Sequence, residues 1–225
     1  TGWGCASPDL PVTGETPEMV ISNIKNIVEG LLINQSPFQL AYVLNVLKKE
    51  IPSASSTMAM VDMALHDLLA RKARIPLFQL LGGYRQHIAT SITIGILPLK
   101  ETLEQAAYHL KKGFTILKLK GGISLGEDIE KVMKLREILG NDFNLRYDAN
   151  QGYTTEESIK FIHKTKSARI EIFEQPTSQI KEERLGQVSR NIDVPVMADE
   201  SIKTLKDAFR LASNDLIDMV NIKIM

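Results

Sequence analysis

The chain has 225 residues, of which 44% are hydrophobic and 24% charged, which is typical of a folded globular protein with one or two domains. Lysine plus arginine and aspartate plus glutamate both number 27, so the zero formal charge argues against nucleic acid or an anionic membrane as a partner. No apolar run reaches the roughly 18 to 20 residues of a membrane span, and the single Cys5 cannot form an internal disulfide. These features predict a soluble cytoplasmic protein.

The first 84 residues are predicted to form a mainly helical unit after a short strand-like start. Prolines and a glycine indicate a loop before Thr16-Pro17-Glu18, which carries a helix cap and a proline in the first turn. Apolar residues at helical spacing then predict three helices: about 18–32, one after the cap signal at Ser36, and about 56–71.

From residue 85 onward, short apolar segments alternate with helical segments. Strands joined through helices must run parallel, as βαβ units. The expected strands lie near 89–94, 115–120, 144–148, 170–174, 194–199 and 219–224, and the expected helices near 101–112, 126–139, 155–166, 180–189 and 203–212. A polar residue closes each strand, at intervals of 24 to 28 residues: Thr93, Lys120, Asp148, Glu174, Asp199 and Lys223.

This regular repeat predicts a (β/α) barrel, in which active-site residues come from the carboxyl ends of different strands. An open, doubly wound sheet is the alternative, but no glycine fingerprint follows the first strand. Six units are visible whereas a closed barrel needs eight, and the chain stops at Met225, just after the sixth strand. We therefore expect an incomplete barrel. The start at Thr1, which looks like the middle of a domain, leaves a removed targeting segment open.

Three acids, Asp148, Glu174 and Asp199, stand at the ends of successive predicted strands. Carboxylates that converge at one barrel mouth repel each other, and a hard divalent cation with oxygen ligands, such as Mg²⁺, would resolve that repulsion. The alternative is that each acid caps the helix that follows it. Three acids in register beside lysines favour the metal site.

Lysines flank this acidic arc. Lys118 and Lys120 share one face of their strand, because side chains alternate along a strand, and Lys223 lies on a distant strand of the ring. Two opposed bases could remove and return the α-proton of a metal-bound carboxylate through an enediolate. Lys118 and the cation would lower the pKa of Lys120.

Gly121 and Gly122 follow Lys120 directly. No Gly-Lys-Ser/Thr pattern comes after them, so a phosphate-binding loop is not indicated. The two glycines are interpreted as conformational freedom for the loop.

Five motifs resemble those of the enolase superfamily, in its muconate lactonizing subgroup, and among its members most closely the dipeptide epimerases of the L-Ala-D/L-Glu epimerase type. They are Lys118-Leu119-Lys120, Asp148-Ala149-Asn150-Gln151-Gly152, Glu174-Gln175-Pro176, Ala198-Asp199-Glu200-Ser201 and Asn221-Ile222-Lys223. The resemblance extends to the helical segment 62–83. It implies part of an α+β capping domain over residues 1–84 and strands 1 to 6 of an enolase-type (β/α) barrel over residues 85–225.

The resemblance also implies roles for individual residues. Asp148, Glu174 and Asp199 would bind Mg²⁺, and Lys120 and Lys223 would be the paired acid/base residues. The supporting residues would be Lys118 at the substrate carboxylate, Thr93 at the peptide part of the substrate, and Asn150 and Glu200 beside the ligands. The implied enzyme is a homo-oligomeric, Mg²⁺-dependent epimerase that inverts an α-carbon of a dipeptide by 1,1-proton transfer.

Several other functions stay open. Within the subgroup they are muconate cycloisomerisation, o-succinylbenzoate synthesis and N-acylamino acid racemisation. A barrel lyase could instead use a lysine as a metal-free Schiff-base nucleophile. A non-catalytic protein is the last alternative, and in it six strands would leave an exposed sheet edge.

Overall fold

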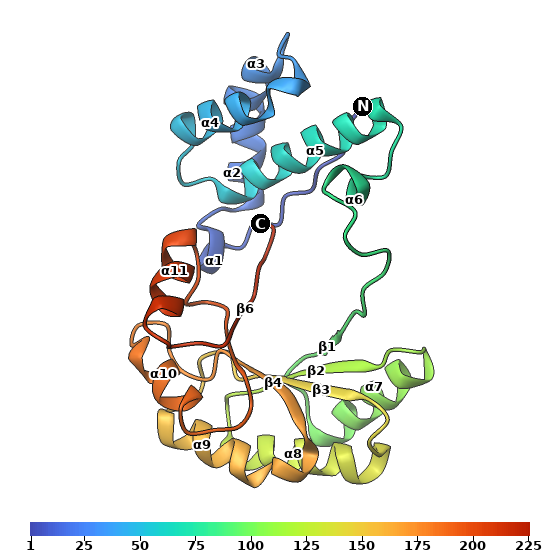
Figure 1. Ribbon diagram of the computed structural model, residues 1–225, viewed down its shortest axis with the longest axis vertical. Helices are drawn as coiled ribbons and strands as arrows, with labels where there is room; N and C mark the ends of the chain where they lie inside the picture. The colour runs from blue at the N-terminus through green and yellow to red at the C-terminus, as the bar shows by residue number, and fades with distance from the viewer. The chain divides into compact units, whose positions relative to one another are not determined.

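A computed structural model describes residues 1–225, which fall into two units: residues 1–87 together with 223–225, and residues 88–222 (Figure 1). Each unit has a hydrophobic core of its own. No helix combines the length and the apolar character that crossing a membrane requires.

The first unit is helical. Its predicted helices are confirmed, with a π-helical turn inside the first of them. In chain order the elements are α1 (Leu10–Thr13), α2 (Pro17–Asn23), η1 (Ile24–Val28), α3 (Glu29–Leu32), η2 (Pro37–Gln39), α4 (Leu40–Glu50), α5 (Ser55–Ala73) and α6 (Leu77–Leu80). The core between these helices is formed by Val28, Val43, Leu47, Val61 and Leu65, among others.

The strand-like start of the chain does not form a strand. Its backbone packs against helix α5 instead of pairing with a strand. A Cβ atom at Gly2 would lie 2.0 Å from the Ala64 carbonyl oxygen, and one at Gly4 would lie 1.9 Å from that of Met60. The alternating glycines therefore permit close contact with a helix.

A buried carboxylate caps α5 at its amino end. Glu15 accepts hydrogen bonds from the backbone N–H of Ser56 at 2.6 Å and of Thr57 at 3.3 Å, and from the Thr57 hydroxyl at 2.6 Å. A negative charge at this end of a helix satisfies its free N–H groups and its dipole. The loop after α1 is thereby fixed to the longest helix of the unit.

The second unit is a parallel sheet of six strands that pair in chain order, β1-β2-β3-β4-β5-β6. This order agrees with the predicted barrel, because a doubly wound sheet would place a later strand beside the first. The strands are β1 (Ile92–Ile94), β2 (Ile116–Lys120), β3 (Asn144–Asp148), β4 (Ile170–Glu174), β5 (Val196–Ala198) and β6 (Met219–Val220). The helices are α7 (Leu99–Lys111), α8 (Leu125–Leu139), α9 (Thr155–Lys164), α10 (Glu183–Ser189) and α11 (Leu205–Ser213), with the 3-10 turn η3 (Lys166–Ala168) before β4.

The two faces of the strands differ in character. Leu117, Leu145 and Phe173 are fully buried in the core of this unit, and helices α7 to α10 lie on one side of the strands (Figure 1). Side chains alternate along a strand, so Lys118 and Asp148 face the opposite side.

A register shift in β4 brings Glu174 to the same face as Asp148. Leu145 of β3 pairs with Ile170, but the next residue, Arg146, pairs with Ile172, so Glu171 is an extra residue in β4. Such a bulge changes the face on which later side chains emerge. Ile170 therefore joins the helix-side core, while Glu174 pairs with Asp148.

The sixth strand is shorter than expected. The prediction of a strand over 219–224 is wrong beyond Val220, where β6 ends. Its partner β5 has three residues, and the pairing stops at Ala198 and Val220. Lys223 therefore follows the strand and does not belong to it.

The loops after β2 and β3 contact each other at Gly122 and Gly152. A Cβ atom at Gly152 would lie 1.9 Å from the Gly122 carbonyl oxygen, and one at Gly121 would lie 1.8 Å from the Tyr147 hydroxyl. Gly122, at φ +99°, also has a conformation that other residues rarely adopt. These glycines therefore permit a close approach of two loops, which is a stronger requirement than the freedom expected from the sequence.

We expect Gly152→Ala to lower the free energy of unfolding by about 1–3 kcal/mol, because the added methyl group overlaps the backbone of Gly122. Gly126→Ala is the matched control. Gly126 lies in the first turn of α8 with no atom near its Cβ position, so alanine there should stabilise the chain by about 0.5–1 kcal/mol. Urea unfolding of both variants measures the two values, and equal stability of the two would contradict the close approach.

Candidate metal centre and active site

The three predicted acids converge. Asp148 and Glu174 are the last residues of β3 and β4 and pair in register, and Asp199 directly follows β5. All three are buried, and one carboxylate oxygen from each lies within 4.8 Å of the others. Parallel strands that end at one edge thus place three carboxylates around one point.

Lys118 lies against two of these acids. Its Nζ is 2.7 Å from Glu174 Oε2 and 3.0 Å from Asp148 Oδ2, and 15% of its side chain is exposed. Burial acts to lower the pKa of Lys118, but the hydrogen bond to Glu174 and the two nearby negative charges outweigh it, so this pKa lies above its usual 10.5. Lys118 is therefore a fixed positive charge.

The pKa of Glu174 lies above its usual 4.5 because burial disfavours the charged carboxylate, although the hydrogen bond from Lys118 acts in the opposite direction. The pKa of Lys118 is raised because its two acids outweigh burial, whereas the pKa of Glu174 is raised because burial outweighs its one lysine. Lys118 has two acids to balance its charge, whereas Glu174 shares a single close ammonium group with Asp148. The cluster therefore has an excess of negative charge.

Lys120 has a different environment. Its Nζ lies 3.6 Å from Asp148 Oδ2, and 37% of its side chain is exposed. It shares a strand face with Lys118 and pairs in register with Asp148. Of the two lysines, Lys120 is the more accessible to a substrate.

The remaining predicted residues divide into two groups. Asn150 donates a long hydrogen bond of 3.5 Å to Glu200, and its backbone N–H donates to Asp148 Oδ1 at 2.9 Å. Thr93 is exposed and pairs in register with Lys118, so it faces the same side of the sheet. Lys223 is exposed and groups with residues 1–87, so residues 88–222 bring together every predicted site residue except Lys223.

Two further residues contact the acids directly or through the backbone. Asn221 donates from Nδ2 to Glu174 Oε1 at 3.0 Å, and the buried Gln175 accepts a hydrogen bond from the Asp199 backbone N–H at 2.8 Å. Both belong to the motifs found in the sequence, but neither was given a role. The available signals were the polar residue in an apolar segment at Asn221 and the position of Gln175 directly after an acid.

Left-handed backbone follows two of the acids. Asn150 and Gln151 have φ +43° and +67°, and Gln175 has φ +34°, a region that residues other than glycine rarely occupy. Strained backbone of this kind persists when its surroundings hold it and is common at functional sites.

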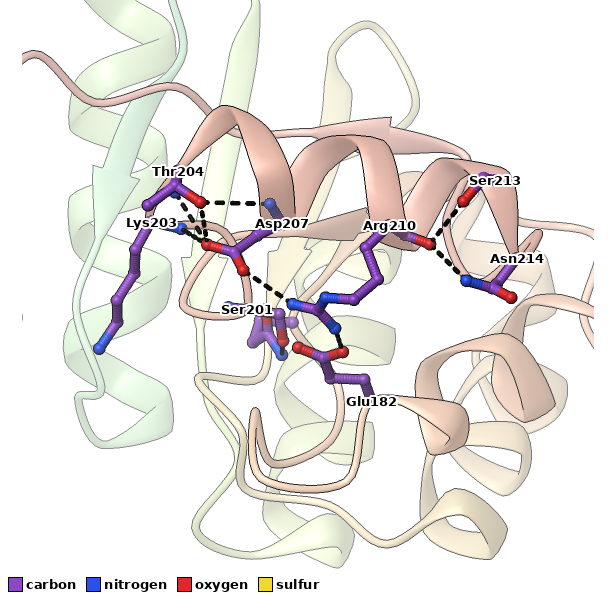
Figure 2. A network of polar contacts seen from close by, with 9 residues as sticks. Glu182, Ser201, Lys203, Thr204, Asp207, Arg210, Ser213 and Asn214 are labelled. Carbon is purple, nitrogen blue, oxygen red and sulfur yellow. Dashed lines mark hydrogen bonds and ion pairs between the residues drawn. The ribbon is translucent and has the colours of Figure 1, made fainter.

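Hydrogen bonds and ion pairs connect the segments behind the site. The Gln151 side chain accepts from the backbone N–H of Gln179, which joins the loops after β3 and β4. Arg210 of α11 forms ion pairs with Glu182, ahead of α10, and with Asp207 of its own helix (Figure 2). The segments after β4 and β5 are thereby held together.

The acid cluster fits a hard divalent cation. It offers oxygen ligands alone, and Asp148 Oδ2 is buried without a hydrogen bond, its contacts being the ion pairs with the two lysines. Nearby, Glu200 Oε2 is also buried without a hydrogen bond. Carboxylate oxygens with room for water and substrate are the ligands that Mg²⁺ prefers.

Comparison with protein families agrees with this geometry. Residues 101–225 match the family model of the enolase C-terminal domain-like proteins, and residues 1–82 match the N-terminal domain of the mandelate racemase/muconate lactonizing enzymes. The chain belongs to the mandelate racemase/muconate lactonizing enzyme group of the enolase superfamily. The six strands are therefore those of an enolase-type barrel domain, preceded by a capping domain.

Several similar proteins are named as epimerases. The L-Lys-D/L-Arg epimerase of Desulforapulum autotrophicum is 40% identical over 230 residues, which cover 100% of this chain and 64% of that protein. A crystal structure of a dipeptide epimerase from Enterococcus faecalis, complexed with Mg and L-Leu-L-Tyr, matches with a TM-score of 0.95 at 35% identity, over 100% of this chain and 63% of that one. A substrate-liganded L-Ala-D/L-Glu epimerase from Bacillus subtilis matches with a TM-score of 0.94 at 34% identity, over 99% and 63% of the two chains.

The predicted family is thus confirmed. The names of these relatives refer to different substrates. The chain spans about 63% of the length of the curated relatives that it matches.

We expect Lys118→Met to destabilise the cation-free chain by about 3–5 kcal/mol at neutral pH, because it leaves buried carboxylates without their closest positive charge. The variant should raise the pKa of Glu174 further. A carboxyl group whose pKa is raised in the folded state lowers the stability of the protein as the pH rises above 4.5, its usual pKa. The destabilisation by Lys118→Met should therefore be smaller below that pH, where Glu174 is protonated in both the folded and the unfolded state.

The matched control is Lys134→Met, which removes an exposed 2.8 Å pair with Glu137 and should change stability by less than about 1 kcal/mol. Urea unfolding with a chelator at pH 4 and pH 7 measures both variants. An equal penalty for Lys118→Met at the two pH values would show that the lysine does not balance the acids.

Proposed function

We propose that this chain is part of a Mg²⁺-dependent dipeptide epimerase that inverts an α-carbon by 1,1-proton transfer. The observation that carries the proposal is the convergence of three buried carboxylates with Lys118 and Lys120 on one face of the sheet. Relatives named as dipeptide epimerases support the substrate class.

Asp148, Glu174 and Asp199 would hold the cation. When bound there, Mg²⁺ supplies positive charge that stabilises the negative charge developing on a substrate carboxylate as the α-proton leaves. Lys118, held protonated by two acids, would add a second fixed positive charge on the same side of the substrate. Asn221 and Asn150 would orient the carboxylates that they contact.

Lys120 would act as one acid/base residue. Its amine form accepts the α-proton on one face of the carbon, while the ammonium form of Lys223 delivers a proton to the opposite face and inverts the centre. In the reverse direction the two lysines exchange roles. Exposure of the Lys120 side chain beside the acids supports its part, and Lys223 is assigned from the motif Asn221-Ile222-Lys223.

Thr93 would contact the peptide part of the substrate. It is exposed on β1 and pairs in register with Lys118, which supports a place beside the charged groups. A dipeptide carries a carboxylate for the cation and a peptide group for a hydroxyl donor.

We also propose that the protein assembles as a homo-oligomer in the cytoplasm.

The purified protein with Mg²⁺ should exchange the α-proton of a dipeptide for solvent deuterium, which proton NMR measures. Lys120→Ala or Lys223→Ala should reduce epimerisation by more than about 100-fold, because each removes one proton-transfer group. The matched control is Lys112→Ala. Lys112 is exposed and precedes the amino end of β2, whereas Lys120 is at the carboxyl end of that strand. Full activity of either site variant would rule out the two-lysine mechanism.

A substrate panel separates this proposal from its rivals. The panel contains L-Ala-L-Glu, L-Leu-L-Tyr, an N-acylamino acid, muconate and the substrate of o-succinylbenzoate synthase. We expect exchange with a dipeptide and its loss with chelator. Turnover of another compound alone would reassign the reaction within the group, and borohydride trapping of a lysine adduct with chelator present would favour a Schiff-base lyase.

A further inference from the structure

One buried amide uses all of its hydrogen-bonding capacity beside the acid cluster. Gln175 is 0% exposed. Its Oε1 accepts from the backbone N–H of Asp199 at 2.8 Å and of Ser201 at 3.3 Å. Its Nε2 donates to the Ser201 hydroxyl at 2.8 Å and to the Thr177 carbonyl oxygen at 2.9 Å.

The backbone of Gln175 is held as firmly as its side chain. Its N–H donates to the Met197 carbonyl oxygen at 2.8 Å, and its carbonyl oxygen accepts from the Gln151 N–H, also at 2.8 Å. Gln175 directly follows Glu174, its side chain reaches Asp199, and Gln151 lies three residues after Asp148. One residue therefore connects the segments that carry all three carboxylates.

The conformation of Gln175 indicates that these contacts hold it in place. Its φ of +34° is unfavourable for a residue with a Cβ atom and persists when the surroundings compensate for it. A methionine of similar size would fill the space but leave the Asp199 and Ser201 N–H groups, both buried, without their acceptor.

We propose that Gln175 is a positioning residue that sets the spacing of the Glu174 and Asp199 carboxylates, and thereby the preference of the cluster for Mg²⁺ over Ca²⁺. This inference rests on the proposed cation site. Mg²⁺ demands nearly ideal octahedral geometry with oxygens at about 2.0–2.1 Å, whereas Ca²⁺ accepts longer and more variable distances. A loosened cluster should therefore lose affinity for Mg²⁺ more than for Ca²⁺.

The test is calorimetric titration of Mg²⁺ and of Ca²⁺ into the purified protein and its variants. Gln175→Met should weaken Mg²⁺ binding by about 10- to 100-fold, the usual effect of removing a partner that orients metal ligands. Ca²⁺ binding should weaken by a smaller factor, so the Mg²⁺/Ca²⁺ affinity ratio falls. Ser201→Ala removes one of the four side-chain hydrogen bonds and should shift this ratio in the same direction by less.

Thr165→Val is the matched control. It removes another buried hydrogen bond, from the Thr165 hydroxyl to the Phe161 carbonyl oxygen. Thr165 precedes the amino end of β4, whereas Glu174 is at the carboxyl end of that strand. Thr165→Val should leave both affinities unchanged. Circular dichroism confirms that each variant is folded at the titration temperature.

Equal weakening for the two cations, or unchanged affinities in both Gln175→Met and Ser201→Ala, would overturn the inference. Should Gln175→Met not fold, an unchanged affinity ratio in Ser201→Ala overturns it. Absence of divalent-cation binding by the unaltered protein would contradict the proposed function and this inference together. Binding that does not depend on Gln175 would contradict the inference alone.

Discussion

The repulsion between three buried carboxylates is the constraint on which the site depends. Asp148, Glu174 and Asp199 bring one oxygen each within 4.8 Å of the others. With an effective dielectric constant of about 20, each pair of full charges at that distance costs at least about 3 kcal/mol. Lys118 balances two of the acids directly, yet burial keeps the pKa of Glu174 above its usual value despite the hydrogen bond from Lys118. A divalent cation is the addition that this charge distribution fits.

The fold maintains this unfavourable arrangement through contacts between the segments that follow the strands. Gly122 and Gly152 allow the loops after β2 and β3 to contact each other, and the Gln151 side chain bonds the loop after β3 to the loop after β4. Gln175 joins the ends of β4 and β5, and Arg210 adds ion pairs behind them. The acids therefore stay close because the backbone behind each of them is bonded to its neighbour.

Much of the fold could be predicted from the sequence because its signals are local. The strands over Asn144–Asp148 and Ile170–Glu174 have the expected limits, since each combines apolar residues with an acid at its carboxyl end. The end of β6 could not be found in this way, because it depends on the length of the neighbouring strand β5. The start of the chain was also misread: packing of Gly2 and Gly4 on α5 is a tertiary contact that strand propensity does not reveal.

The same distinction holds for the site. The regular spacing of strand ends predicted which acids converge, but the partners of Lys118 were not apparent. The sequence predicted that Lys118 binds the substrate carboxylate and tunes Lys120, which stays a prediction, and the structure adds its ion pairs with Asp148 and Glu174. The bulge at Glu171 and the hydrogen bonds of Gln175 likewise depend on register and on loop contacts, which no single stretch of sequence encodes.

The most direct test of the account is a crystal structure of the protein with Mn²⁺ in place of Mg²⁺, with the metal located by anomalous scattering. We predict one strong anomalous peak between the carboxylate oxygens of Asp148, Glu174 and Asp199. A structure in which the three acids keep their positions while manganese binds elsewhere, or does not bind, would contradict it.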